Sequence, residues 1–150
     1  DWGNDRIQQF SAGSEFIATY GVSGRGDGEF LRPSGVAVDE RGYLYVSDWG
    51  NERVQILDKN GAFLQKLRGQ ATLSKWATNF LEINIEEGEA RSKANLEPDI
   101  DIFDPENPHA QSAHIEKLFW APMSVKLDDL GKVYVTEGNR HRIQVYQRIS

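Results

Sequence analysis

The 150-residue sequence contains no cysteine and only one methionine, Met123. Without thiols the chain can form neither a disulfide framework nor a zinc–thiolate site. That composition fits a reducing cytosol and equally fits a disulfide-free, secreted, bacterial-type soluble protein. No run of about 18 apolar residues occurs, so no membrane-spanning segment is predicted. The chain begins at Asp1, any signal peptide would lie upstream, and the compartment stays unpredicted.

Basic side chains are nowhere clustered, although the net charge of −6 is unevenly distributed. Residues 82–106 hold nine acidic residues against Arg91 and Lys93 and therefore carry −7, whereas the remaining chain carries +1. A nucleic-acid surface needs clustered Lys and Arg to neutralise phosphates. The charge pattern therefore predicts no nucleic-acid partner.

What the sequence does contain is a repeat. Residues 1–10 read DWGNDRIQQF and residues 48–57 read DWGNERVQIL, an offset of 47 positions. At a second offset of 89, residues 30–57 align without a gap with residues 119–146. Self-similarity at such a period is typical of repeat architectures, in which each unit is one supersecondary motif.

Each unit predicts short strands separated by turns. In the second unit we expect strands at residues 34–39, 43–47, 53–57 and 62–66, with Gly42 supplying the positive φ of the first turn and Gly131 repeating it. Four strands joined by short turns form an antiparallel meander, and packing such sheets radially buries both faces. A β-sandwich would not require the same turn to recur. The predicted fold is therefore all-β, built of β-propeller blades, with a helical and irregular acidic insertion between two of them.

The segment GEFLRPSGVAVDERGYLYVSDWGNERVQIL, residues 28–57, resembles an NHL repeat, a propeller blade found about five or six to a ring. The resemblance covers residues 1–68 and 119–147. It implies a fragment of a longer, six-bladed propeller, which we do not expect to be a stable monomer alone. The implied divisions are the end of one blade (1–30), a complete blade (31–68), the insertion (69–118) and three strands of a further blade (119–150).

The repeated turn is predicted to be architectural. Short Asp and Asn side chains accept backbone N–H groups at turns, and an Arg nearby can pair with a carboxylate. Binding residues normally differ between blades, whereas scaffold residues recur. The structural turn residues are Asp48, Asn51, Arg53, Asp1, Asn4, Arg6, Glu137 and Arg142.

Two further positions of this turn are distinctive: one differs in residue type between the copies, and the other is a tryptophan in two of them. His141 aligns with Glu52 and Asp5, so we expect an exposed, variable position and not a ligand. Trp2 and Trp49 lie, by the resemblance, on the face that propellers use for ligands. They form either a recognition platform or a packing contact between neighbouring turns.

The insertion predicts an amphipathic helix. Leu73, Trp76, Phe80 and Leu81 follow helical spacing, Thr72 or Ser74 can cap the helix, and it is expected to run towards Asn95. We expect its apolar stripe to pack onto the propeller, with a lid or a docking surface as the alternatives; on those, Trp76 and Phe80 join the candidate binding face. Residues 96–112 are expected to be an irregular strap, and residues 113–118 a short helical or extended return.

Metal ligands are not predicted with any strength. Asp99, Asp101 and Asp104 suggest a cation site only weakly, because the EF-hand pattern fails at the later ligand positions. His109 and His114 match neither strand nor helix metal spacing, so both are expected to be solvated loop residues.

The predicted function is a non-catalytic binding or scaffold module for a protein or small-molecule ligand, with no cofactor. No nucleophile–base set or phosphate-binding loop is recognisable. The alternative is a propeller hydrolase or lyase, gluconolactonase-like or amidating-lyase-like, whose channel metal would lie mostly outside this chain. RNA binding, which the resemblance implies for some animal tripartite-motif proteins, is disfavoured by the charge.

Overall fold

The computed structural model describes residues 1–98, 104 and 107–147, and its main feature is a series of three antiparallel sheets. The first sheet pairs two strands, the second four and the third three, each in sequence order. They comprise β1 (Ile7–Phe10) and β2 (Phe16–Tyr20); β3 (Pro33–Val38), β4 (Leu44–Asp48), β5 (Arg53–Leu57) and β6 (Phe63–Leu67); and β7 (Pro122–Leu127), β8 (Lys132–Glu137) and β9 (Arg142–Gln147).

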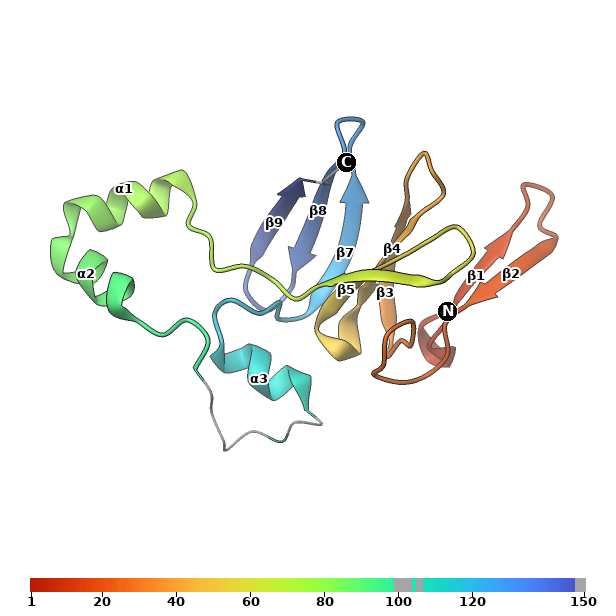
Figure 1. Cartoon of the computed structure of the whole chain (residues 1–150), viewed down its shortest axis with the longest axis horizontal. Coiled ribbons are helices and arrows are strands. Elements are labelled where there is room, and N and C mark those ends of the chain that lie inside the picture. The colour runs from red at the N-terminus through yellow and green to blue at the C-terminus, as the bar shows by residue number, and fades with distance from the viewer. Residues whose placement is uncertain (99–103, 105–106, 148–150) are drawn as a thin grey trace.

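The second sheet packs against both of its neighbours (Figure 1). Side chains on β4 alternate between faces, so Leu44 and Val46 meet the first sheet while Tyr45 meets the third. The cluster towards the third sheet includes Val133 and Val135 and is almost fully buried. Burial of both faces by face-to-face sheets is the arrangement of propeller blades, which confirms the predicted all-β fold.

The predicted strands and turns are confirmed. The four strands expected between residues 34 and 66 are all present, shifted by at most one residue at their ends. Gly42 has φ +82° and Gly131 φ +77°, as the turns required. In the first of these turns the Asp39 carboxylate accepts the backbone N–H groups of Arg41 and Tyr43, each at 2.9 Å. This side chain therefore fixes the turn directly.

In the first two blades the turn that precedes the third strand is a short 3₁₀ helix. It is η1 (Trp2–Asn4) before β1 and η2 (Trp49–Asn51) between β4 and β5. Because β4 runs away from the glycine turn, η2 lies at the opposite end of the blade from that turn. The face formed by η1 and η2 is called the turn face below.

The insertion differs from the predicted single helix. It forms α1 (Lys75–Ile83) and α2 (Ile85–Lys93), separated at Asn84. Ser74 caps α1 by accepting the N–H of Ala77 at 3.2 Å, which selects it over Thr72. None of the helices in the described part of the chain is both long and apolar enough to cross a bilayer.

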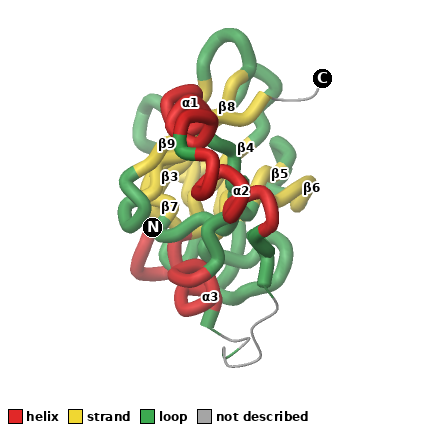
Figure 2. Tube along the Cα trace, turned by 90° about the vertical axis from the view of Figure 1, so that its left-hand side faces the viewer, coloured by secondary structure: helices red, strands yellow, loops and turns green. Residues whose placement is uncertain are grey.

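The prediction that the apolar stripe of α1 packs onto the propeller is wrong. Trp76 keeps 76% of its surface exposed and Phe80 44%. The hairpin of α1 and α2 projects to one side of the sheets (Figure 1), and it stands in front of them when the molecule is turned (Figure 2). The reason is local: α1 packs against α2, not against a blade.

The expected irregular strap of residues 96–112 lies partly outside the described residues, and its residues 108–112 belong to a third helix, α3 (Pro108–His114). Asn107 caps it by accepting the N–H of Ala110 at 3.2 Å, and Pro108 occupies the first turn. Asn followed by Pro is a helix-start signal that was readable in the sequence. The predicted return at residues 113–118 contains only the end of this helix.

Candidate functional site

The turn acid Asp48 is fully buried and sits at the centre of a hydrogen-bond cluster. Its Oδ1 accepts the backbone N–H of Leu31 at 2.8 Å. Its Oδ2 accepts from Asn51 Nδ2 at 2.9 Å, Arg53 Nε at 2.8 Å and Gln55 Nε2 at 3.2 Å. Burial raises the pKa of the Asp48 carboxyl, in opposition to these hydrogen bonds, which favour the carboxylate.

The guanidinium of Arg53 ties the preceding loop to this cluster. Its Nη1 donates to the carbonyl of Arg25 at 2.9 Å, and its Nη2 donates to those of Gly26 at 2.7 Å and Glu29 at 2.9 Å. The fork of donors thus holds a loop that has no regular structure of its own. These contacts join the link that precedes the blade to the blade's own turn.

The other two copies repeat the arrangement with different burial. In the third blade Glu137, also buried, pairs with Arg142 and accepts the N–H of Trp120 at 2.9 Å. In the first, Asp1 accepts from Asn4 Nδ2 and Arg6 Nε, each at 2.9 Å, but remains exposed. The turn residues named from the sequence therefore occupy equivalent places and make equivalent contacts in the three copies.

The next turn position is not the exposed, variable one that the sequence suggested. Asp5 and Glu52 both adopt left-handed backbone, with φ 53° and 52°. The Asp5 carboxylate accepts the N–H of Arg32 at 2.6 Å, and the Glu52 carboxylate accepts that of Ala121 at 2.6 Å. Each acid therefore binds the residue just before the first strand of the following blade, and Glu52 is only 1% exposed. The correction follows from the packing of successive blades, which turns the outside of one blade into the contact with the next.

The carboxyl groups of Asp5 and Glu52 have pKa values shifted in opposite directions. The Arg32 N–H and the Ser23 hydroxyl lower the pKa of Asp5. Burial is the largest influence on Glu52 and raises its pKa. His141, at the third equivalent position, has φ 50° and is exposed.

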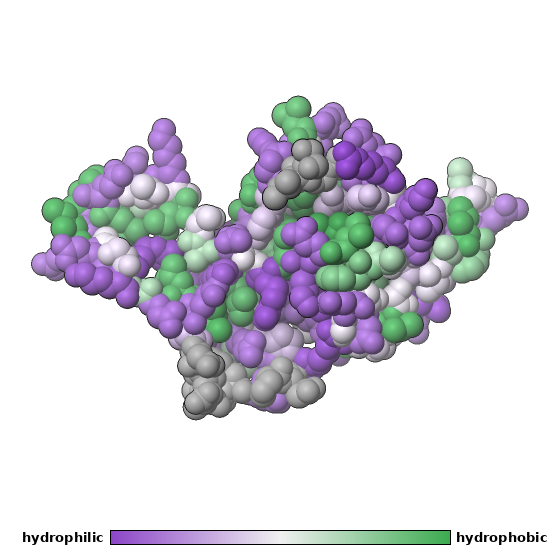
Figure 3. All heavy atoms as spheres, in the orientation of Figure 1, coloured by the Kyte–Doolittle hydropathy of each residue, from purple (hydrophilic) through white to green (hydrophobic). Residues whose placement is uncertain are grey.

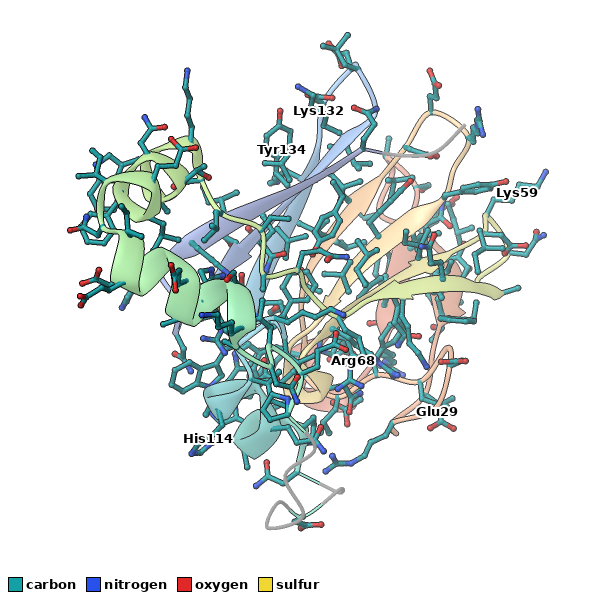
Figure 4. The ribbon with its side chains drawn as sticks, turned by 60° about the vertical axis from the view of Figure 1, so that its left-hand side comes forward. Glu29, Lys59, Arg68, His114, Lys132 and Tyr134 are labelled. Carbon is teal, nitrogen blue, oxygen red and sulfur yellow. The ribbon has the colours of Figure 1, made fainter. Side chains whose placement is uncertain are left out.

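His109 lies on helix α3 and not in a loop as predicted, and its side chain, although 48% exposed, contacts the turn face. Its Nδ1 contacts the Glu52 carboxylate, and its Nε2 accepts the indole N–H of Trp120 at 3.2 Å. Since Nε2 is the acceptor from Trp120, Nδ1 is the ring nitrogen that can donate to Glu52. His114 lies on the same helix, exposed at the edge of the molecule (Figure 4).

Aromatic rings form a row across the turn face. The ring centroids of Trp2 and Trp49 are 5.3 Å apart, those of Trp49 and His109 6.3 Å, and those of His109 and Trp120 6.0 Å. Spacings of this size are those of interacting aromatic pairs. The row joins three blades and α3, and Trp2 at its end is 45% exposed.

Two guanidinium groups accompany the row. Arg32 lies 6.0 Å from the centroid of Trp49, and Arg140 lies 5.7 Å from that of Trp120. Arg140 also donates to the carbonyl of Ile115 at 2.7 Å, and burial lowers its pKa. Arg32 is exposed, so its guanidinium is the accessible cation of the row.

A polar pocket of about 340 Å³ lies between η2 and α3. Arg25 and Arg68 are exposed at its wall, while Arg53 and Lys66 are engaged with other groups. Arg68 is placed at the centre of the view in Figure 4. The pocket extends the positive character of the turn face next to the aromatic row.

The remaining predicted residues lie elsewhere. Trp76 and Phe80 stack on each other at 5.9 Å on α1, at the far side of the molecule from η1 (Figure 1). Asp104 is exposed, whereas Asp99 and Asp101 fall outside the described residues. Among the residues that are described, no group of three or more His, Asp or Glu side chains could hold a metal ion.

Sequence comparison identifies the repeated unit. Residues 30–57 and 119–146 match the family model of the NHL repeat. The chain contains two NHL repeats. These are the two segments whose turn acids, Asp48 and Glu137, occupy equivalent buried positions, so the NHL pattern and the blade geometry coincide.

The chain is similar to short segments of several animal proteins, and it covers only a small part of their length. Protein lin-41 of Caenorhabditis elegans is 54% identical over 50 residues, which is 33% of this chain and 4% of that protein. E3 ubiquitin-protein ligase TRIM71 of Rattus norvegicus is 40% identical over 50 residues, 33% of this chain and 6% of that protein. Protein brain tumor of Drosophila melanogaster is 46% identical over 44 residues, 29% and 4%. These animal relatives give no support to a bacterial-type protein.

Sequence reasoning missed three residues at the aromatic row: two of its rings and the guanidinium beside it. Trp120 stands where the other NHL copy has Leu31, and that replacement was a readable signal. Arg32 is likewise marked only by its place before Pro33. His109 has no counterpart in the repeat, because it comes from the insertion, and nothing in its spacing indicated that it would reach Glu52.

Proposed function

We propose that the chain is a non-catalytic binding module whose turn face takes a protein segment carrying aromatic or apolar side chains next to acidic ones. The observation that carries this proposal is the row of rings at Trp2 and Trp49, with the exposed guanidinium of Arg32 beside it. A ligand side chain gains apolar contact from the indoles, and a carboxylate gains a charged donor from Arg32. The turn acids themselves serve as the scaffold.

The surroundings of the row support an acidic ligand. Arg25 and Arg68 stand at the pocket beside η2, and an acidic side chain that follows the aromatic one along a peptide can reach this pocket. Tryptophan and arginine are the residues most enriched at the centres of protein interfaces. The same chemistry, stacking plus cations, would also serve single-stranded RNA.

A protein ligand is favoured over RNA by the charge. The chain carries −6 overall, and the described part of the turn face offers few exposed cations, Arg32 and the pocket residues Arg25 and Arg68 among them, whereas phosphate backbones need many. The NHL resemblance implies RNA binding for some animal tripartite-motif proteins, so the nucleic acid is kept as an outcome of the experiment below. An enzyme of the lactonase or lyase type finds no support in the names of the relatives.

We also propose the division of the chain that the resemblance implies. Residues 1–30 would end one blade, residues 31–68 form a complete blade, residues 69–118 are the insertion, and residues 119–150 belong to a further blade. On this view α3, which packs on η2, is the part of the insertion that borders the binding face.

A selection experiment tests the binding proposal. The immobilised chain is exposed to a phage-displayed peptide library and, in parallel, to a pool of single-stranded RNA oligonucleotides. We expect enriched peptides that combine an aromatic residue with Asp or Glu, and a loss of their binding by about tenfold or more in the Arg32→Glu variant, because a cation becomes a like charge.

The matched control is Arg41→Glu, the same charge change in the exposed turn at the opposite end of the blade. It should leave peptide binding unchanged. Enrichment that survives Arg32→Glu, or that is lost equally in Arg41→Glu, contradicts the assignment of the face. Retention of RNA that depends on Arg32 would replace the protein ligand by a nucleic acid.

A further inference from the structure

The helix α1 presents an apolar stripe that nothing in the described part of the chain covers. Trp76, Phe80 and Ile83 follow the spacing i, i+4, i+7 and therefore share one face of the helix. Their exposed fractions are 76%, 44% and 80%. Figure 3 shows hydrophobic side chains gathered over this end of the molecule. Contiguous apolar surface of this kind marks an interaction site.

The stripe lies on a helical hairpin, α1 and α2, whose position is fixed by packing and by an ion pair. The opposite side of α1 packs closely on α2, where Gly88 leaves room for the backbone of Leu81; an added Cβ there would lie 2.6 Å from the Leu81 carbonyl oxygen. The hairpin is attached through Arg91, which forms an ion pair with Glu116 at 2.8 Å and reaches the carbonyl of Ala71 at 3.3 Å. The bare stripe is therefore a feature of the folded hairpin, on the face that α2 does not cover.

Charges of opposite sign flank the stripe on one side. Lys75 and Glu82 are seven residues apart, which is about two helical turns, so their side chains leave α1 on the same flank. They stand near opposite ends of the helix, with Trp76 and Phe80 between them along the axis. The flank is thus positive at the start of the stripe and negative at its end.

We propose that α1 pairs antiparallel with α1 of a second copy of the chain. A two-fold axis perpendicular to the plane of two facing, antiparallel helices keeps each charged flank on the same side of the interface. It places Lys75 of each copy beside Glu82 of the other, twice. The apolar stripes meet in the middle, with Trp76 opposite the region of Ile83. The stripe and its flank are therefore complementary to themselves, as a two-fold contact requires.

A second copy explains the charge order better than an unrelated partner does. A groove with a basic rim on another protein would attract Glu82 but repel Lys75. In a pair of identical helices, each Lys75 meets a Glu82, so both charges are paired. Since α1 has only nine residues, the contact is small, and we expect a weak dimer that forms in the micromolar range or above.

The experiment is sedimentation-equilibrium mass measurement of the chain from about 10 μM to about 1 mM, in low and high salt. The variants are Lys75→Glu, Glu82→Lys and the two combined. Each single reversal turns both ion pairs of the dimer into repulsions, and should raise the dissociation constant about tenfold in low salt. The double variant should restore it. High salt should reduce these differences.

Two further variants separate the stripe from other surfaces. Phe80→Ser removes apolar contact and should weaken the dimer, whereas Glu87→Lys, with the same charge change as Glu82→Lys but on α2, should not. A chain that is monomeric at every concentration overturns the proposal. So does a dimer that Phe80→Ser leaves intact, because its contact then lies on the sheets, and so does a double variant that stays as weak as the singles.

Discussion

The carboxylate of Glu52 accepts the backbone N–H of Ala121 at 2.6 Å, although 69 residues separate them. Asp5 and Arg32 repeat this contact one blade earlier, at the same distance. Alongside it, the acid of each blade's own turn binds the neighbouring N–H, Asp48 that of Leu31 and Glu137 that of Trp120. Two carboxylates, one from each of two successive blades, thus secure the start of both the second and the third blade.

Removal of the Glu52 carboxylate should loosen the contact between the second and third blades. In Glu52→Ala the buried N–H of Ala121 loses its acceptor, which costs about 1–3 kcal/mol of unfolding free energy. Glu52→Gln keeps an acceptor oxygen and should lose less. Urea unfolding followed by circular dichroism measures both, with Glu15→Ala, at an exposed turn, as the control. Equal losses in the Ala and Gln variants would contradict the hydrogen-bond role.

The turn acids allow one substitution to be compared at a buried and an exposed site. Asp48→Asn replaces an oxygen that faces three donors by an amide and leaves the buried Arg53 charge unpaired, so we expect a loss of about 3–5 kcal/mol. Asp1→Asn changes the same ion pair in the first copy, where it is exposed, and should cost less than about 1 kcal/mol.

Chemical unfolding of the two Asp→Asn variants at neutral pH measures the difference directly. It should be several-fold larger at position 48, since only there are the surrounding donors removed from water. Similar losses at positions 1 and 48 would show that burial does not set the strength of this cluster.

The acid dependence of stability should change in opposite directions at the two blade-linking acids. The pKa of Asp5 is lowered in the folded state, so its contribution is present above its ordinary pKa of about 3.9 and is lost as the pH falls through the folded value. Asp5→Asn should therefore make the loss of stability in acid shallower.

For Glu52 the sign is reversed, because burial raises its pKa. The folded state binds the proton of Glu52 more tightly than the unfolded state does. This adds to the free energy of unfolding below the ordinary pKa of a glutamate, and the added stability is lost as the pH rises through the folded pKa. Glu52→Gln removes this gain and should make the acid loss steeper. Unfolding free energies measured between about pH 3 and 7 test both variants, and a change of the same sign in both would contradict the assignment.

The strands were predictable because their signals are local. Alternating side chains such as Val36 and Val38, and turn glycines such as Gly42, act within a few residues, so the sequence alone places β3 and β4 almost correctly. The equivalence of Asp48 and Glu137 could also be read from the repeat. These features need no knowledge of what lies across the blade.

What the sequence could not show depends on contacts between distant segments. The contact of His109 with Glu52 depends on the position of α3. The exposure of the stripe around Trp76 depends on the packing of α1 on α2 in place of a blade. An amphipathic pattern predicts that one face of a helix is apolar, but it does not predict which element packs on that face.

The four tryptophans offer the most direct measurement of the central claim, that ligands bind the turn face while the rest of each turn is scaffold. Each indole N–H gives one signal in a ¹⁵N–¹H correlation spectrum, assignable with single Trp→Phe variants. On titration with a peptide enriched in the selection above, the account predicts that the signals of Trp2 and Trp49 move while that of Trp76, on α1, stays in place. Movement of Trp76 alone, or equal movement of all four, would contradict it.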